Sequence, residues 1–522
     1  MTRGGGGSRI YEVSVTLPSA GPDSFVYDSP LPYPGNLCRL LDRAADLYPG
    51  RRAIGFLPDG GFLHYAEFLD RTCRMAHALE RLGVRRGDRV VISARNSCAY
   101  LCAALAVFRL GAVLVPTNPI IRHYELAHIL AETRPRLVFC ESLHLQWVVQ
   151  AFREARVPMP PLVTLDGREE VATFVEDLDF SVSRRACADA DPDETAMIVY
   201  TAAMEGHALG ARLSHGALFH DAACCAAACF NLARSEEETV LTVLPLFHLH
   251  GFSSGFLSPL CGGVTAVPLN PSHGACEVVE IMGRLGVTQA ATVPVVLYAL
   301  GPPLRERPDV CARLRNLVSG GIAAPADLLA EYRDRLGIVI REGYGLTECS
   351  PTVTWCAFGT PAKPGTVGRS LPCCEVRVAD AEGRPLPAGE EGEICVRGAN
   401  LFSGYHRRPE HTRSVLRDGW FRTGDLGRLD PEGYLTITGL CKDMLNLYGL
   451  KVYPREVERI LGRHPGVSDV RVYAEHSERF GCRVACDVRL KAGCTLTEAS
   501  FRTWCRHSLS AYKIPRTVRF VH

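Results

Sequence analysis

Hydrophobic residues along the chain follow helical and strand-like periods in alternation. The helical segments are Leu37–Leu47, Tyr65–Leu82 and Ala99–Leu110, and the short apolar runs are Arg89–Ser93, Ala112–Pro116 and Arg136–Cys140. Such alternation is typical of βαβ units and mainly parallel sheets. It predicts an α/β fold, with a further strand at Thr195–Thr201.

The pattern changes after Asp418, where turn-forming residues become frequent. A turn at Asp430–Gly433 is expected to precede a strand at Tyr434–Thr438. Further along, the sequence predicts a short helix at Pro454–Leu461 and two strands, at Val467–Tyr473 and Gly481–Leu490. A small α+β domain should therefore follow a large one. We predict a flexible segment at 1–30, a large domain at 31–438, a hinge at 439–443 and a small mobile domain at 444–522.

Length and composition exclude several classes of protein. A chain of 522 residues is too long for one ordinary core, and a net charge of +1 with 22% charged residues gives no electrostatic reason to expect nucleic acid or an anionic membrane as partner. The 22 cysteines form no C-x-x-C pair and lie in apolar contexts. They indicate buried thiols in a reducing compartment and no metal site, so we expect a cytoplasmic protein.

One segment carries more chemistry than any other, REGYGLTECSP at Arg341–Pro351. If the preceding run Leu336–Ile340 is a buried parallel strand, the segment emerges where open α/β sheets bind ligands. Tyr344 offers a flat face for a base. Gly343 and Gly345 allow the backbone to approach a ligand closely. Thr347 supplies a hydroxyl and Glu348 a carboxylate, which suit a phosphate and its Mg²⁺.

The YGLTE text resembles the adenine-binding signature of acyl-adenylate-forming enzymes, the acyl-CoA synthetase superfamily. Further stretches resemble that family in the same order: LPLFHLHGF (Leu244–Phe252), SGGIAAP (Ser319–Pro325), GTVGRSLP (Gly365–Pro372), GEICVRG (Gly392–Gly398), GYHRRPEHT (Gly404–Thr412), DGWFRTGDLG (Asp418–Gly427) and YGLKVYPREVE (Tyr448–Glu458). The resemblance covers roughly residues 35 to 522.

The resemblance implies roles for individual residues. Asp425 matches the acceptor of the ribose hydroxyls, Gly320 and Gly321 match the backbone along the adenine, and Glu342 stands where an amide often reads the exocyclic amine. His248 matches the gate between acyl pocket and reaction centre.

Two more matches lie near the predicted hinge. Lys442 occupies the position about which the family's small domain rotates between its adenylating and thioester-forming poses. Gly449 matches the glycine beside which the pantetheine arm of CoA passes, where a side chain would fill the tunnel.

The family's phosphate-binding loop, T-S-G-T-T-G-x-P-K-G, is degenerate in this chain. The aligned text is TAAMEGHALG, Thr201–Gly210, in which the family residues persist only at Thr201, Gly206 and Gly210. The serine, first glycine, two threonines and lysine are replaced, respectively, by Ala202, Ala203, Met204, Glu205 and Leu209. A desolvated Glu205 would repel a triphosphate.

Two further departures concern the α-phosphate. The family's hinge arginine is replaced by Leu440, and the printed sequence ends at His522, before the position of the family's adenylating lysine. If His522 is the natural terminus, that lysine is absent. Every departure thus falls on phosphate-side groups, whereas adenine, ribose, gate, hinge and pantetheine positions persist.

This pattern leads to the interpretation of a non-adenylating acyl-CoA ligase that takes acyl-AMP from a separate adenylating enzyme, passes the acyl group to CoA and does not use ATP and Mg²⁺. It resembles the split ligases of platensimycin-type diterpenoid antibiotic biosynthesis, which implies a bulky diterpenoid acid. Two alternatives stay open: a complete ATP-dependent ligase with compensating arginines such as Arg212, and a pseudoenzyme that binds AMP or acyl-CoA. The sequence does not decide whether the acyl acceptor is CoA or the thiol of a carrier protein. It also does not decide whether the protein is a monomer or a homodimer.

Overall fold

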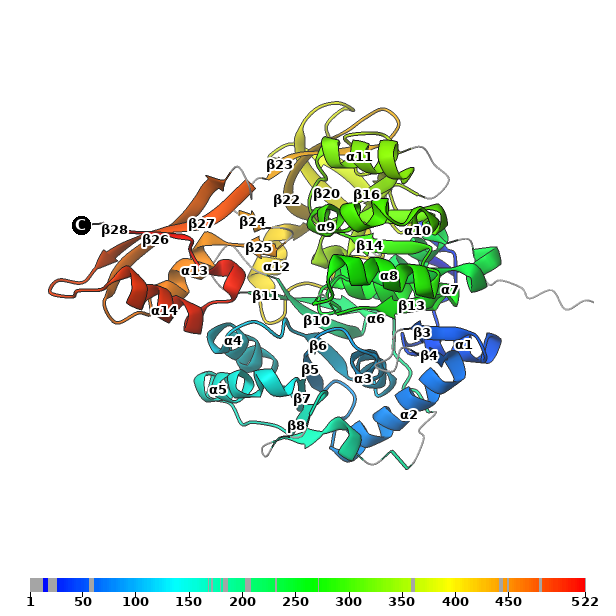
Figure 1. The fold of residues 1–522 in the computed structure, drawn as a ribbon, viewed down its shortest axis with the longest axis horizontal. Helices are drawn as coiled ribbons and strands as arrows, with labels where there is room; N and C mark the ends of the chain where they lie inside the picture. The colour runs from blue at the N-terminus through cyan, green and yellow to red at the C-terminus, as the bar shows by residue number, and fades with distance from the viewer. Residues whose placement is uncertain are drawn as a thin grey trace, which may run out of the picture.

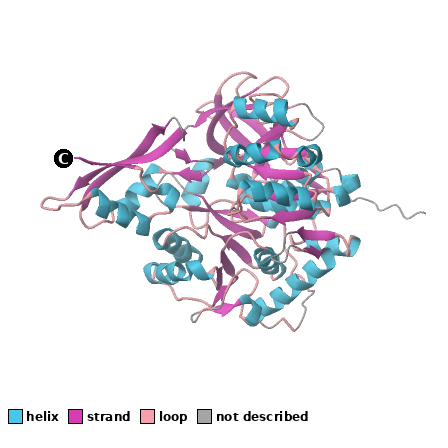
Figure 2. Cartoon of the chain, viewed as in Figure 1, coloured by secondary structure: helices cyan, strands magenta, loops and turns pink. Residues whose placement is uncertain are grey.

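A computed structural model of the chain has a large N-terminal domain with a smaller C-terminal domain at its side (Figure 1). The structure describes residues 13–16, 26–55, 61–167, 169, 172–178, 180–181, 186–201, 208–230, 232–270, 272–357, 362–440, 445–447, 450–477 and 481–521. The mixed helix and strand content confirms the α/β prediction (Figure 2).

The first sheet of the large domain has seven strands in the order β11 (Leu209–Ser214), β10 (Thr195–Thr201), β6 (Val113–Pro116), β5 (Arg89–Ser93), β7 (Leu137–Cys140), β8 (Leu162–Thr164) and β9 (Thr173–Phe174). All neighbours are parallel except the edge pair β10 and β11. The helices and short turns of this half are α2 (Tyr65–Arg81), α3 (Cys98–Arg109), α4 (His123–Thr133), η1 (Ser142–His144), α5 (Leu145–Ala155), η2 (Val175–Asp177) and α6 (His215–Cys229).

The second sheet has nine strands in the order β18 (Arg369–Ser370), β17 (Thr352–Trp355), β16 (Ile340–Gly345), β15 (Asn316–Ser319), β14 (Gln289–Thr292), β12 (Thr239–Thr242), β13 (Thr265–Pro268), β3 (Arg52–Gly55) and β4 (Phe62–His64). The helical segments of this half are α1 (Arg39–Leu47), η3 (Leu232–Glu237), the π-helix η4 (His250–Leu257), α7 (Ser258–Gly262), α8 (Ala275–Leu285), α9 (Pro294–Arg305), α10 (Pro308–Arg313), α11 (Ala326–Leu336) and η5 (Thr347–Cys349).

Three apolar cores hold these layers together. The largest contains residues of both sheets together with α1, α2, α3 and α6, so these helices connect the cores of the two sheets. A second core packs α8 to α11 on the nine-stranded sheet, and a third packs α4 and α5 on the seven-stranded sheet. Parallel strands covered on both faces explain the continuous apolar runs in the sequence.

A five-stranded antiparallel sheet completes the large domain and leads toward the small one. It consists of β19 (Cys374–Ala379), β20 (Gly392–Gly398), β22 (Trp420–Leu429), β21 (Leu416–Arg417) and β23 (Leu435–Leu440), with α12 (Pro409–Val415) beside it. The small domain comprises β24 (Leu445–Leu447), β25 (Leu450–Val452), α13 (Pro454–Leu461), β26 (Val467–Ser477), β27 (Gly481–Leu490), α14 (Glu498–Ser508), η6 (Ala511–Lys513) and β28 (Thr517–Val521).

The structure differs from the sequence predictions in two places. The run Leu336–Ile340 is not the strand before the REGYGLTE segment: α11 ends at Leu336, Gly337 has a left-handed φ of 67°, and β16 begins only at Ile340. The segment is therefore itself the strand. Within residues 1–30, expected to be flexible, β1 (Val13–Thr16) and β2 (Val26–Ser29) form an antiparallel pair.

The cysteines agree with the prediction of buried thiols. The cysteines in the described ranges are free thiols, and most are buried. None of the described helices has the length and apolar character needed to cross a membrane.

Candidate functional site

The predicted adenine segment lies beside the REGYGLTE strand. Gly320 and Gly321 follow β15, whose last residue, Ser319, is paired with Glu342 of β16. The Glu342 carboxylate accepts a hydrogen bond of 2.9 Å from the Ala324 amide and so ties β16 to the loop after β15. Burial raises the pKa of Glu342, although the Ala324 amide opposes the shift. Both predicted elements therefore meet at the carboxyl ends of neighbouring parallel strands.

Tyr344 and Asp425 are brought together from different sheets. The Tyr344 hydroxyl, on β16, donates a hydrogen bond of 2.6 Å to Oδ2 of Asp425, on β22. Burial, with the Asp425 charge second, raises the pKa of Tyr344 well above its ordinary value, so the phenol stays protonated. The base-stacking and ribose-binding candidates thus lie side by side, as one nucleoside would require.

The Glu348 carboxylate is buried against the loop after β20. It accepts a hydrogen bond of 2.8 Å from the Tyr405 hydroxyl, and its backbone carbonyl accepts one of 2.8 Å from the Phe402 amide. Thr347 precedes it in η5. No group of three or more His, Cys, Asp and Glu side chains among the described residues could hold a metal ion. One carboxylate can bind Mg²⁺ here only together with substrate phosphates.

The glycines of the segment are required by the packing of the chain itself. A Cβ on Gly343 would lie 2.8 Å from Cε3 of Trp355, and one on Gly345 would lie 2.0 Å from the Pro351 carbonyl oxygen. Strand β17 and Pro351 just before it therefore occupy the space that side chains would need at these two positions. The predicted close approach to a ligand remains a prediction.

His248 lies directly before the π-helix η4, which begins at His250. The His248 side chain is exposed, whereas His250 is half-buried. Burial lowers the pKa of His250 to about 4, and the neighbouring His248 adds to the effect, so the His250 imidazole is neutral at pH 7. His250 is a further candidate residue that the sequence analysis missed. A Cβ on Gly320 would lie 2.9 Å from its Cε1, which places His250 against the predicted adenine segment. A π-helix, frequent at functional sites, has no sequence signature that would have indicated this contact.

The degenerate phosphate loop joins β10 to β11. Thr201 and Leu209 are paired across these strands, and a Cβ on Gly210 would lie 2.8 Å from Ile198. Leu209, where the family has lysine, is only 8% exposed and belongs to the main core. The other loop positions named above lie outside the described residues: Ala202, Ala203, Met204, Glu205 and Gly206.

The hinge region is described only up to Leu440. This residue ends β23, and its backbone is paired with Asp425, so the chain leaves the large domain beside the candidate ribose site. Lys442 and Gly449 lie outside the described residues. Their predicted roles as pivot and pantetheine contact stay predictions.

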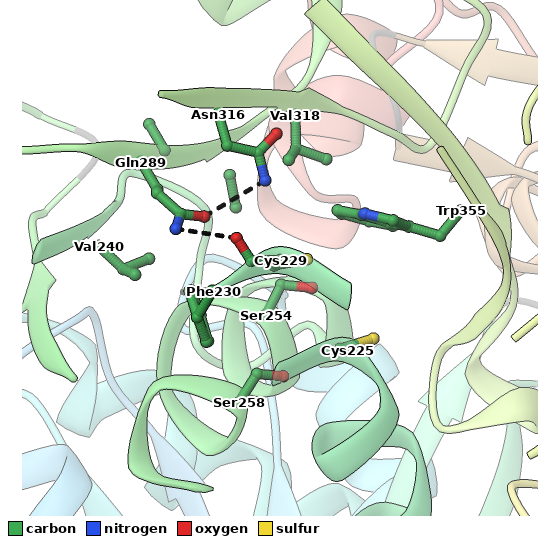
Figure 3. Close-up of a pocket in the computed structure, with 12 residues that line it drawn as sticks. Cys225, Cys229, Phe230, Val240, Ser254, Ser258, Gln289, Asn316, Val318 and Trp355 are labelled. Carbon is green, nitrogen blue, oxygen red and sulfur yellow. Dashed lines mark hydrogen bonds between the residues drawn. The ribbon is translucent and has the colours of Figure 1, made fainter. Parts of the chain in front are cut away.

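A small cavity lies next to these groups (Figure 3). Its walls come from α6, η4, α7 and four strands of the nine-stranded sheet, and its lining includes Cys225, Cys229, Phe230, Gln289, Asn316 and Trp355. Trp355 packs on Gly343, which places the cavity against the back of β16. The sequence analysis did not find this cavity because its lining is scattered from residue 225 to residue 355.

Comparison with known proteins defines the class. The model of the AMP-binding enzyme family matches residues 41–406, and that of the AMP-binding enzyme C-terminal domain matches residues 456–522. The chain belongs to this family, the acyl-CoA synthetase superfamily. A feruloyl-CoA synthase from Amycolatopsis is 33% identical over 462 residues, 88% of this chain and 90% of that one.

Two solved structures illustrate the similarity of fold. A double mutant of o-succinylbenzoate CoA synthetase from Bacillus subtilis, bound with a product analogue, has a TM-score of 0.80 at 26% identity and covers 92% of this chain and 94% of its own. ATP-bound MatB from Rhodopseudomonas palustris has a TM-score of 0.70 at 30% identity and covers 93% and 95%.

Proposed function

We propose that the protein catalyses the thioester-forming half-reaction of the family, in which acyl-AMP and CoA give acyl-CoA and AMP. The CoA sulfur attacks the acyl carbonyl carbon, the thiol proton is released, and the carbon–oxygen bond to AMP breaks. The observation that carries the proposal is the contrast between the Tyr344–Asp425 pair, suited to a nucleoside, and Leu209, a core side chain at the position of the family's phosphate-binding lysine.

The energetics of the two half-reactions favour this division. Adenylation must stabilise charge that develops on the phosphates, and losing one group of that kind typically costs roughly 10²–10³ in rate. An acyl-AMP is already activated, so holding it in line with a thiol supplies most of the catalysis. The retained candidates, His248 and Asp425 among them, serve that second task.

The proposal has consequences for partners. It requires a separate enzyme that supplies acyl-AMP, and we place both in the cytoplasm because the cysteines are mostly buried free thiols. The relatives are named as CoA synthases and CoA ligases, so the proposal of a single half-reaction sets this chain apart from what their names state. The implied link to diterpenoid antibiotic pathways gains no support from the comparisons.

A complete ligase is the second candidate, because Arg212 could compensate for the missing lysine. Its guanidinium donates a hydrogen bond of 2.9 Å to the Ser403 carbonyl, which leaves its other nitrogens for a phosphate. A direct comparison separates the two candidates. Synthetic acyl-AMP with CoA should give acyl-CoA at least roughly 10²-fold faster than acid, ATP, Mg²⁺ and CoA do. Pyrophosphate release at a comparable rate would contradict the proposal and favour the complete ligase.

Nucleotide affinity provides a separate prediction. AMP should bind at least as tightly as ATP with Mg²⁺, because Tyr344 and Asp425 serve the nucleoside, whereas the carboxylate that Glu205 brings to the phosphate loop would repel a triphosphate. Calorimetric titration of both nucleotides checks this, with Glu205→Thr as the variant expected to strengthen ATP binding alone. ATP binding tenfold tighter than AMP to the unmodified protein, about 1.4 kcal/mol, would refute it.

A further inference from the structure

Two free cysteines from distant parts of the chain lie side by side in the large domain. Cys38 precedes α1 and is fully buried, whereas Cys187, in the segment that leads to β10, is partly exposed. Hydrogen bonds join the two segments on either side of this pair. Nδ2 of Asn36 donates to the Ala188 carbonyl at 3.0 Å, and Nη2 of Arg39 donates to the Cys187 carbonyl at 3.4 Å. A side-chain hydrogen bond links the two thiols themselves, so the sulfurs are direct neighbours.

The two thiols differ in how readily they ionise. The hydrogen bond from Cys38 lowers the pKa of Cys187, and the positive charges of Arg109 and Arg39 add to this effect against burial. Burial, with the hydrogen bond second, raises the pKa of Cys38 well above its ordinary value. The thiolate is the reactive form of cysteine, so Cys187 should react first. An accessible thiol of low pKa beside a second cysteine is the arrangement of redox-sensing sites.

A second pair of neighbouring thiols provides a contrast within the same domain. Cys98 and Cys102 of α3 also share a hydrogen bond, which lowers the pKa of Cys98. They stand at positions i and i+4 of one helix, where the Cβ atoms are about 5–6 Å apart. A disulfide requires about 3.5–4.5 Å, so the helix would have to unwind for this pair to close. Cys38 and Cys187 lie on separate segments and are free of that restraint.

We propose that Cys187 and Cys38 form an oxidative modification site that reacts with hydroperoxides and closes to a reversible disulfide. The Cys187 thiolate attacks the terminal oxygen of the peroxide, the oxygen–oxygen bond breaks, and a sulfenic acid forms while the other oxygen leaves as water or an alcohol. The Cys38 sulfur then attacks the Cys187 sulfur, loses its proton, and the sulfenic oxygen leaves as water. The two thiols together lose two electrons and two protons, which reduce one peroxide.

The disulfide would stabilise the large domain. It would close the loop between Cys38 and Cys187, which contains the strands from β3 to β9. A cross-link over a long loop restricts the unfolded chain more than one over a short loop. The oxidised protein should therefore unfold at a higher temperature than the reduced protein. In a reducing compartment the bond would be transient and would persist only while peroxide is present.

Treatment of the full chain with a small molar excess of hydrogen peroxide tests the proposal. Peptide mass spectrometry of the unmodified protein should detect a bond between Cys38 and Cys187 that dithiothreitol removes, and the unfolding temperature should rise by roughly 5 °C. Cys38→Ala should lose the bond and the rise, and dimedone should then trap a sulfenic acid at Cys187. Cys187→Ser should leave Cys38 a thiol. The matched control, Cys98→Ala, should form the bond at the rate of the unmodified protein.

The exposed thiols of Cys276 and Cys494 report general oxidation in the same sample, and Cys187 should react at least about tenfold faster than either. Equal rates at the three positions would overturn the proposal, as would oxidation of Cys187 without a bond to Cys38. An unchanged unfolding temperature in the cross-linked protein would refute the stabilising effect. The decisive measurement uses the unmodified protein, so it holds even if a variant fails to fold. None of these results depends on acyl transfer, so the proposed function stands or falls separately.

Discussion

Replacing Lys513 by methionine should release the small domain from the large one. The Lys513 ammonium donates hydrogen bonds of 2.6 Å to Glu125 on α4 of the large domain and 2.7 Å to Glu456 on α13 of the small domain. All three side chains are only about 5–6% exposed. Ser510 donates a further bond of 2.6 Å to Glu125. One lysine therefore bridges two carboxylates across the domain interface.

The pKa shifts agree with a charged cluster. Burial alone would raise the pKa of Glu125, but Lys513 and the hydrogen bonds of Ser510 and Arg122 outweigh burial and lower it. Burial would likewise lower the pKa of Lys513, and the two carboxylates raise it well above its ordinary value. Without the ammonium, two buried carboxylates face each other, and breaking a buried pair in this way typically costs about 3–5 kcal/mol. Separation of the domains rehydrates both carboxylates, so the cost should appear as undocking.

The radius of gyration from X-ray scattering, and protease sensitivity around residues 441–449, measure this release. Lys491→Met, at an exposed lysine of the same domain, is the matched control and should change neither. Adding Glu125→Gln and Glu456→Gln to Lys513→Met removes the unpaired charges and should restore docking. A Lys513→Met protein as compact and resistant as the control would show that the ion cluster does not hold the domains together.

The second large effect concerns Asp221, a fully buried carboxyl on α6. The Ser253 hydroxyl donates to its Oδ2 at 2.6 Å and the Thr352 amide donates to its Oδ1 at 2.8 Å. Burial raises its pKa to about 8, and these hydrogen bonds offset only part of the shift. Because the unfolded carboxyl ionises near pH 3.9, the folded protein retains a proton between about pH 4 and 8 that the unfolded chain has lost. The free energy of unfolding should therefore fall as pH rises through this window, by up to about 1.4 kcal/mol per unit, and level off above pH 8.

Asp221→Asn should remove this slope. The amide has the shape of the protonated carboxyl: its oxygen can accept from Thr352 and its N–H₂ can donate to Ser253. Relative to the unmodified protein, the variant should gain about 4 kcal/mol between pH 5 and pH 8. Denaturant unfolding of the large domain at several pH values measures the gain, with Asp193→Asn, at an exposed position, as control. Parallel pH profiles for Asp221→Asn and the unmodified protein would contradict the assignment.

Local structure could be read from the sequence because its causes are local. Strands Arg89–Ser93 and Thr195–Thr201 and helix Pro454–Leu461 have the predicted bounds, since apolar periodicity and turn residues set each element within a few neighbours. The family motifs were also recognisable, because each is a short contiguous segment. The one clear error, the strand placed at Leu336–Ile340, arose where an apolar helix end runs into a strand and periodicity cannot separate them.

Only the tertiary structure determined the contacts between segments that lie far apart in the chain. Lys513 meets Glu125 across 388 positions, and Tyr344 meets Asp425 across 81. Sequence patterns report which residues are buried, whereas sheet order and domain docking determine which buried polar groups find a partner in the chain.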